Sequence, residues 1–273
     1  MGTLYLVGTP IGNLEDISPR ALRILSEVDF IAAEDTRVSL KLLNRFGIKK
    51  PMVSYYEHNQ RERGGQILAR ILNGESCAII SDAGMPCISD PGEEMVALCA
   101  ENAIPVIVIP GPNAAISALA ISGLPTGRFA FEGFLSVKAS SRRSHLETIR
   151  GETRTLVFYE APHKLLATLT DLLDTLGDRR IALARELTKM HEEVLRTTLS
   201  QAVPYYTQNS PRGEFVIIVE GAKPEPVEQI SLKIAVEMTR KLQAQGIPLS
   251  QAAKDVAAET GYKKGDLYKA ALC

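Results

Sequence analysis

Short apolar runs alternate with longer amphipathic segments along the first half of the chain. Strands are expected at residues 4–7, 30–33, 77–81 and 105–109. Helices are expected at residues 61–72 and 93–101. A further helix opens at Ser18-Pro19, where Ser18 can cap the first turn and Pro19 suits its first position. Strands that alternate with helices predict a mostly parallel sheet covered on both faces.

The pattern changes at the breaker-rich segment 123–127, where we place a domain boundary. A different arrangement begins with residues 129–134, and strands of a second α/β domain are expected at residues 155–160, 181–184 and 215–219. Pro224-Glu225-Pro226 then indicates a linker. Beyond it, two breaks separate helical segments, one of which Ser250 is expected to cap, and this predicts a helix-turn-helix-like module. The expected domains are therefore 1–122, 123–222 and 228–273.

Loops rich in Gly and Pro follow three of the expected strands of the first domain. They are Gly8–Leu14, Asp82–Gly92 and Pro110–Ala115. Ligands in open α/β sheets bind at the carboxyl ends of strands, so these loops are expected to build one cleft. The first loop has neither the G-x-G-x-x-G fingerprint nor the G-K-[ST] ending of a P-loop, and a simple packing turn is the alternative for it.

Together with Arg185–Lys189, these loops resemble the motifs of the ribosomal RNA small subunit methyltransferase I family. The resemblance extends over roughly the whole chain. The resemblance implies an α/β fold of two tetrapyrrole methylase-type (class III) domains with a methyl-donor cleft between them, plus a small C-terminal helical module. It also implies S-adenosylmethionine as donor, S-adenosylhomocysteine as product and no metal. The implied reaction is methylation of a cytidine ribose 2′-hydroxyl in the decoding region of 16S rRNA, within the small ribosomal subunit, by a homodimer.

The donor is expected to contact residues of the three loops and of the strand at 155–160. These are Ile11, Asp82, Gly84, Met85, Pro86, Ile88, Asn113, Ala114, Ala115, Phe158 and Tyr159. The family commonly carries Thr at the position of Met85 and an aliphatic residue at that of Cys87. A hydrogen bond from that Thr hydroxyl is therefore not available to this chain, although backbone contacts can persist.

Catalytic and RNA-binding candidates come from charged clusters at strand ends and from basic segments. Glu34, Asp35 and Arg37 are the catalytic candidates, and Asp82 is a further carboxylate that could accept a proton. The RNA-binding candidates are Lys138, Arg142, Arg143, Arg185, Lys189, Lys263 and Lys264. For each cluster the alternative is an ion pair or a solvated surface without a functional role.

The formal net charge of −1 gives no overall attraction to nucleic acid, so RNA binding requires local basic patches. The four Cys lack C-x-x-C pairing, which favours reduced thiols and a cytoplasmic location, and we expect no metal and no membrane segment. Two other functions stay open at this point. One is a small-molecule methyltransferase acting on a tetrapyrrole-like acceptor, and the other is a ligand-sensing regulator that binds nucleic acid.

Overall fold

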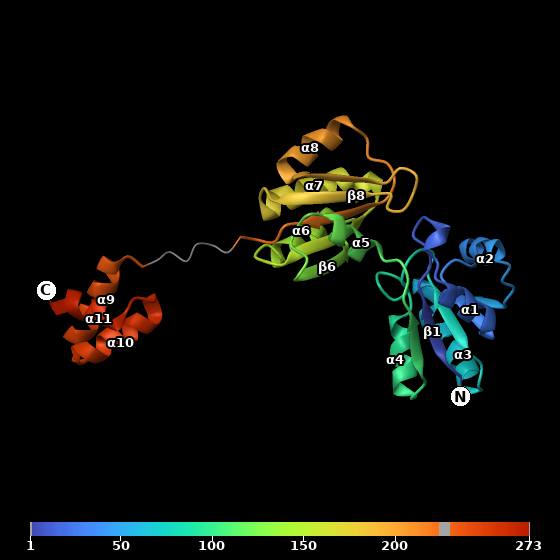
Figure 1. Ribbon diagram of the computed structural model, residues 1–273, viewed down its shortest axis with the longest axis horizontal. Helices are drawn as coiled ribbons and strands as arrows, with labels where there is room; N and C mark the ends of the chain where they lie inside the picture. Colours follow the sequence, from blue (N-terminus) through green and yellow to red (C-terminus); the bar gives the residue numbers. More distant parts are fainter. Residues whose placement is uncertain (1, 224–229, 273) are drawn as a thin grey trace. The chain divides into compact units, whose positions relative to one another are not determined.

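A computed structural model describes residues 2–223 and 230–272. The chain divides into two compact units, Met1–Ala222 and Lys223–Cys273, and the larger unit contains two α/β halves (Figure 1). The expected linker at 224–226 lies outside the described residues, as do the outermost residues of the domain expected at 228–273. Within the described residues, no helix is long and apolar enough to span a membrane.

The first half is built on a fully parallel sheet, as expected, with the strand order β3-β2-β4-β1-β5. Its strands are β1 (Leu4–Val7), β2 (Phe30–Ala33), β3 (Met52–Ser54), β4 (Cys77–Ile80) and β5 (Val106–Ile109). The 3₁₀ turns η1 (Leu14–Asp16) and η2 (Glu57–Asn59) lie in its connections. Residues 36–45 form helix α2, which was not expected, and the Asp35 side chain caps its first turn.

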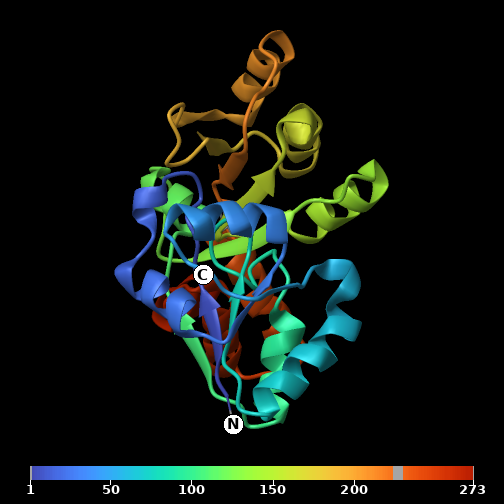
Figure 2. The same ribbon diagram turned by 90° about the vertical axis from the view of Figure 1, so that its right-hand side faces the viewer.

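Helices cover both faces of this sheet, since its strands are apolar on both sides (Figure 2). α1 (Pro19–Glu27) and α2 (Thr36–Arg45) pack on one face through Leu25 and Leu43. α3 (Gln60–Leu72) and α4 (Glu93–Glu101) pack on the other through Ile67 and Met95. The cap expected at Ser18 is confirmed, because its Oγ accepts a hydrogen bond of 3.0 Å from the Ala21 amide.

The second half has a mixed sheet with the strand order β6-β7-β10-β8-β9. Its strands are β6 (Phe129–Phe134), β7 (Thr155–Glu160), β8 (Arg180–Arg185), β9 (Glu193–Thr198) and β10 (Phe215–Val219). Only β6 and β7 are parallel neighbours, and β9 was not expected. One face is covered by α6 (Ala139–Thr148), α7 (Pro162–Leu176) and α8 (Leu199–Gln208).

Helix α5 (Ala114–Ile121) covers the other face of the second sheet. Its buried Ala118 and Leu119 belong to one apolar cluster with Val157 of β7 and Ile218 of β10. Its residues fall within the domain expected at 1–122, yet its packing partners lie in the following half. The start of α5 lies beside the loops that follow β1 and β4, since Ile11 packs against the same cluster and a Cβ built on Gly84 would lie 3.4 Å from the Pro112 carbonyl oxygen.

Over its described residues, the smaller unit consists of three helices, α9 (Leu232–Ala244), α10 (Leu249–Thr260) and α11 (Lys264–Leu272). Ala235, Ala253, Val256 and Leu267 form its core. The cap expected at Ser250 is wrong: Pro248 occupies the cap position, so Ser250 already lies in the first turn of α10. Gly261 ends α10 with a left-handed φ of 76°, a conformation that glycine adopts without steric cost.

Candidate functional site

The three Gly/Pro-rich loops of the first half are joined to one another by backbone contacts. Thr9 and Gly84 form an antiparallel bridge, with hydrogen bonds of 2.9 and 3.2 Å between their amide and carbonyl groups. Gly8 and Gly111 pack backbone against backbone, because a Cβ built on Gly8 would lie 2.6 Å from the Gly111 Cα. The loops therefore form one connected surface at the carboxyl ends of β1, β4 and β5.

A cavity of about 510 Å³ opens beside these loops, between them and the second half of the same unit. Its volume falls in the range of about 300–1,000 Å³ that is typical of small-ligand sites. Eight of the expected donor-contact residues line it: Ile11, Asp82, Gly84, Met85, Ile88, Asn113, Ala114 and Tyr159. Most of the donor-contact residues proposed from the sequence therefore share one cavity.

Pro86, Ala115 and Phe158 are not among the lining residues. Side chains alternate between the faces of a strand, so Tyr159 faces the cavity while Phe158 is fully buried in the core beneath α7. Pro86 is buried in its loop. Ala115 acts through its backbone, because its amide donates a hydrogen bond of 3.2 Å to the Tyr159 hydroxyl.

Gly84 leaves space in the cavity, and Asn113 caps the helix that begins beside it. The amide and carbonyl of Gly84 are both engaged by Thr9, so the missing side chain is what leaves room for a ligand. A Cβ there would contact Ile11 and Pro112, and its φ of +88° disfavours any larger residue. The Asn113 side chain accepts a hydrogen bond of 3.0 Å from Ile116 and so caps α5.

Three carboxylates from the first half line one wall of the cavity: Glu34, Asp82 and Asp90. Burial raises the pKa of Glu34 and that of Asp82. Burial also raises the pKa of Asp90 to about 6, and the negative charge of Glu34 adds to this shift. Among the described residues, none of the three forms an ion pair with a basic side chain.

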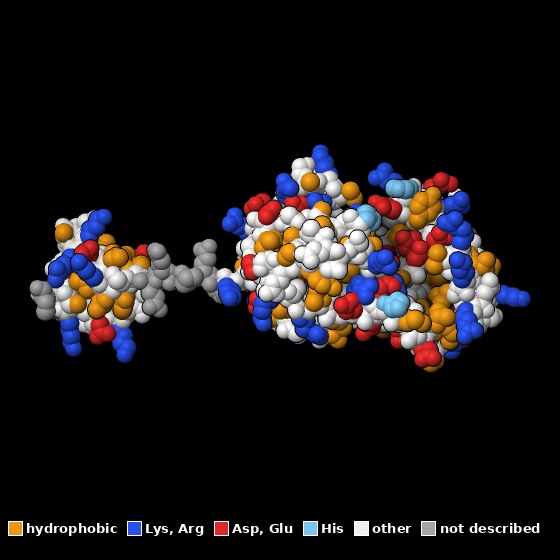
Figure 3. Space-filling model, turned by 90° about the horizontal axis from the view of Figure 1, so that it is seen from above, with side chains coloured by type: hydrophobic (Ala, Val, Ile, Leu, Met, Phe, Trp, Pro, Cys, Tyr) orange, Lys and Arg blue, Asp and Glu red, His pale blue; other side chains and the backbone are white. Residues whose placement is uncertain are grey.

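Asp90 was not among the residues singled out from the sequence as site residues. It lies in the loop expected to hold the donor, and a carboxylate within a Pro- and Gly-rich turn was the available signal. Figure 3 shows acidic side chains gathered around a hollow in the larger unit. Carboxylates in a cavity that lack a basic partner and have pKa values raised by burial are typical of binding or catalytic groups, because burying a charge costs folding free energy.

Glu34 and its neighbours differ in position. Glu34 lines the cavity and accepts a hydrogen bond of 3.3 Å from the Asp82 amide, while Asp82 accepts one of 3.1 Å from the Asp35 amide. Asp35 caps α2 and pairs with Arg37 at 2.6 Å, and this guanidinium lowers the pKa of Asp35 to about 2. Neither Asp35 nor Arg37 lines the cavity. Of the three catalytic candidates, only Glu34 therefore lines the cavity.

The opposite wall comes from the second half, and most of it was not expected from the sequence. Its residues are Phe134, Tyr159, Glu160, Ala161, Pro162, His163, Ala184, Leu187, Lys189, Glu214, Phe215 and Val216. The carboxylates of this wall are partnered. Glu160 accepts hydrogen bonds from Thr168 and Ala161, and Lys189 pairs with Glu214 and Glu186 at 2.9 Å each.

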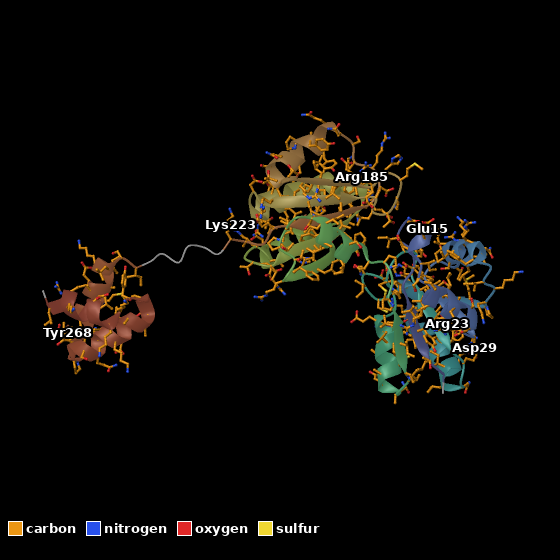
Figure 4. The ribbon with its side chains drawn as sticks, in the orientation of Figure 1. Glu15, Arg23, Asp29, Arg185, Lys223 and Tyr268 are labelled. Carbon is orange, nitrogen blue, oxygen red and sulfur yellow. The ribbon has the colours of Figure 1, made fainter. Side chains whose placement is uncertain are left out.

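The expected RNA-binding residues fall into three groups. Lys138, Lys263 and Lys264 are exposed. Arg185, at the end of β8 (Figure 4), pairs with Glu193, and Lys189 makes its two ion pairs with Glu186 and Glu214. Arg185 and Lys189 thus form ion pairs within the protein, which was the alternative to RNA binding that the sequence left open.

Arg142 is the exception among these basic residues. Its side chain is only 8% exposed and its guanidinium pairs with Asp171 at 2.6 Å, so Arg142 has the structural ion pair that was the alternative to RNA contact. The helical spacing of α6 turns Arg142 inward. Arg143, by contrast, pairs with the other oxygen of Asp171 at 2.8 Å and keeps a side chain that is 63% exposed.

Among residues 2–223 and 230–272, no group of three or more His, Cys, Asp or Glu side chains is arranged to hold a metal ion.

Comparisons with known proteins place this arrangement in a family. The family described as Tetrapyrrole (Corrin/Porphyrin) Methylases matches residues 3–203, and the RsmI C-terminal HTH domain matches residues 233–272. The chain is 50% identical to ribosomal RNA small subunit methyltransferase I of Synechocystis sp., over 100% of this chain and 98% of that protein. It is 48% identical to the protein of the same name from Pseudomonas aeruginosa, over 99% and 97% of the two chains.

Solved structures show the same fold at lower identity. A uroporphyrin-III-C-methyltransferase from Thermus thermophilus superposes with a TM-score of 0.57 at 21% identity, covering 80% of this chain and 94% of that one. Another structure of that enzyme, with a TM-score of 0.55 and 22% identity, is complexed with S-adenyl homocysteine and covers 80% of this chain and 97% of that chain.

Proposed function

The chain belongs to the tetrapyrrole (corrin/porphyrin) methylases and, within them, to the ribosomal RNA small subunit methyltransferase I family, and we propose that it methylates a ribose 2′-hydroxyl of a cytidine in the decoding region of 16S rRNA. S-adenosylmethionine is the proposed donor, and S-adenosylhomocysteine the product. The acceptor is the small ribosomal subunit, in keeping with the name of the full-length relatives. The alternatives, a tetrapyrrole-like acceptor and a ligand-sensing regulator, are distinguished by a methyl-transfer experiment.

The contrast between the two walls of the cavity carries this proposal. One wall presents Glu34, Asp82 and Asp90 without basic partners in the described part of the chain, and apolar side chains such as Leu187 and Val216 line the other. A ligand with both a cationic centre and a flat apolar ring system suits such walls. Opposite charges attract more strongly where water is excluded, and the apolar side chains can pack against the rings. A sulfonium donor with an adenosyl group has both properties.

When bound, the donor supplies an activated methyl group, and the protein has to align the acceptor and accept a proton. The loops after β1, β4 and β5 provide alignment, because their mutual backbone bonds leave them little freedom to shift. Asp90 and Glu34 are the proposed proton acceptors. With its pKa at about 6, Asp90 is ionised at neutral pH yet basic enough to assist departure of a hydroxyl proton.

Exposed residues on both units are proposed to contact rRNA phosphates. Lys138 and Arg143 belong to the larger unit, and Lys263 and Lys264 to the helical unit. Because the net charge of the chain is close to zero, these local cations supply the attraction to RNA. The domain limits 1–122, 123–222 and 228–273 stay part of this proposal, with α5 functionally linked to the second domain by its packing.

We also propose that the enzyme acts in the cytoplasm as a homodimer. Large apolar side chains remain exposed on β5 and α5, among them Val108 and Ile116, which are 50% and 49% accessible in the single chain. Such side chains are typical of surfaces that a partner covers. Sedimentation of the wild type and of Val108→Glu tests this, because a dimer through β5 dissociates in the variant and a monomeric wild type contradicts the proposal.

The deciding experiment measures transfer of tritium-labelled methyl groups from S-adenosylmethionine to small ribosomal subunits that lack the modification. The proposal expects one methyl group per subunit, mapped to a cytidine ribose in the decoding region. Transfer to a porphyrin-like acceptor in place of subunits identifies the small-molecule alternative. Donor binding without transfer to any acceptor identifies the regulator.

A further inference from the structure

Phe134 lies at the edge of the cavity, and its side chain is unusually exposed to solvent for an aromatic residue. It is the last residue of the edge strand β6, it lines the cavity, and 57% of its surface is accessible. Exposing an aromatic ring to water is unfavourable, since full burial of such a side chain stabilises by roughly 1.5–3 kcal/mol. The fold itself therefore gives no reason for this placement.

An irregularity in the strand aims this ring at the cavity. The pairing of β6 with β7 shifts by one residue between Phe131 and Gly133, so that Phe134 lies opposite Tyr159. In an unbroken register Phe134 would lie opposite Glu160, and a shift by one residue reverses the face on which a side chain lies. Gly133 permits the shift with a φ of +63°, a conformation that favours glycine.

Tyr159 supports the ring from behind. The two ring centroids are 5.4 Å apart with their planes tilted by 56°, and Phe131 contacts Tyr159 from another side at 5.0 Å. The Tyr159 hydroxyl also accepts the hydrogen bond from the Ala115 amide, which fixes its position. Phe134 is thus backed by a fixed aromatic ring and open to solvent on the remainder of its surface.

We propose that Phe134 stacks on a nucleobase of the RNA, that of the nucleotide whose ribose enters the cavity. This inference rests on the proposed function and adds a substrate-positioning residue to it. The neighbouring wall carries Glu34, Asp82 and Asp90, whose negative charges repel phosphates, so an uncharged contact has to hold the nucleotide at this edge of the cavity. Aromatic side chains stack on unpaired bases without requiring a charge, and single-stranded RNA is commonly recognised in this way.

The test compares Phe134→Ala, Phe134→Tyr and Val137→Ala in steady-state methylation of small subunits. Val137 is also exposed, at 72%, and lies outside the lining, so it controls for loss of surface apolar area. Loss of one stacking contact raises KM for subunits about tenfold in Phe134→Ala, with the dissociation constant of S-adenosylmethionine within twofold of wild type. Phe134→Tyr retains the wild-type KM, because its ring can still stack.

An unchanged KM in Phe134→Ala, or a KM raised equally in Phe134→Tyr, overturns the inference. A parallel loss of donor affinity, measured by calorimetry, also overturns it, because the ring would then contact the donor. These results differ from a failure of the proposed function itself. In that case the wild-type protein transfers no methyl group to subunits at all.

Discussion

The two walls of the cavity handle charge in opposite ways. On the wall of the first half, Glu34 and Asp90 have raised pKa values and no basic partner among the described residues. On the wall of the second half, Lys189 lowers the pKa of Glu186 and pairs with Glu214. Charges on the second wall stabilise the fold locally through their ion pairs. Burying the carboxylates of the first wall costs folding free energy, and a bound cation can offset this cost.

Backbone geometry follows the same division. The first wall consists of loops at the ends of parallel strands, fastened by the Thr9–Gly84 bridge and the Gly8–Gly111 contact. The second wall is formed largely by side chains near the ends of strands such as β7 and β10. We infer that the first wall holds the cationic centre of the donor and carries the chemistry, and that the second offers apolar surface to the donor's ring system.

The largest expected effect comes from filling the first wall. In Gly84→Val the new Cβ meets Ile11 and Pro112 in a backbone region unfavourable to valine, so methylation and donor binding fall to background. Calorimetry and the labelled-methyl assay measure both. Gly127→Val is the matched control, because its Cβ meets nothing within 4 Å, and circular dichroism checks that both variants fold. Donor affinity retained in Gly84→Val would remove the loop from the site.

Removing a charge of the second half should affect stability more than function. Arg142→Met leaves Asp171 buried with one partner fewer, and the free energy of unfolding is expected to fall by about 3–5 kcal/mol. Arg143→Met removes an exposed partner of the same carboxylate and is expected to cost no more than about 1 kcal/mol. Urea denaturation measures both. Equal losses in the two variants would contradict the distinction between a buried and an exposed partner.

Asp90 provides a test of the first wall by pH. Since the pKa of Asp90 is raised to about 6, the ionised fraction grows as pH rises through 6, and kcat is expected to rise with it and then level off. Asp90→Asn is expected to reduce kcat by about 100-fold and to flatten this profile. Glu214→Gln, on the second wall, serves as the control and keeps the wild-type profile. If the dependence of kcat on pH is unchanged in Asp90→Asn, another group accepts the proton of the hydroxyl.

The same carboxyl predicts the pH dependence of stability without ligand. A carboxyl whose pKa is raised by folding is more easily ionised in the unfolded chain, so stability falls as pH increases from the ordinary value near ~4 through about 6. Asp90→Asn is therefore expected to be more stable than wild type at pH 7 and similar to it at pH 3.5. Thermal melts at these two pH values measure the difference. A variant less stable than wild type at pH 7 would contradict the conclusion that the ionised Asp90 destabilises the fold.

The smallest expected effect concerns the helical unit, which folds around a core of its own. Replacing Lys263 and Lys264 with Gln is expected to leave donor affinity unchanged and to weaken subunit binding about tenfold at physiological salt. The salt dependence of binding should also become shallower. Lys254→Gln, on α10, is the control. Unchanged affinity and salt slope would show that these lysines do not contact RNA.

The sequence predicted the first wall well because its signals are local. A buried strand followed by Gly, Pro and Asp identifies a rigid loop, and Gly84, Met85 and Asn113 lie where that pattern indicated. The parallel sheet and the start of α1 at Ser18 followed from similar local signals.

The second wall depends on tertiary packing, which no local pattern reports. The register shift at Gly133 decides which way Phe134 points, and the strand alternation that excludes Phe158 from the cavity depends on which face α7 covers. The burial of Arg142 likewise depends on Asp171, which lies on another helix. The same reason explains why α5 was expected in the preceding domain: its apolar partners lie far along the chain.

The most direct test of the division between the two walls is an experimental structure of the protein with S-adenosylhomocysteine bound. We expect the ligand in the cavity lined by Ile11, Met85 and Tyr159, with its sulfur closer to the carboxylates of the first wall than to those of the second. A ligand bound elsewhere, or one whose sulfur lies against Glu214 and Lys189, would contradict this division.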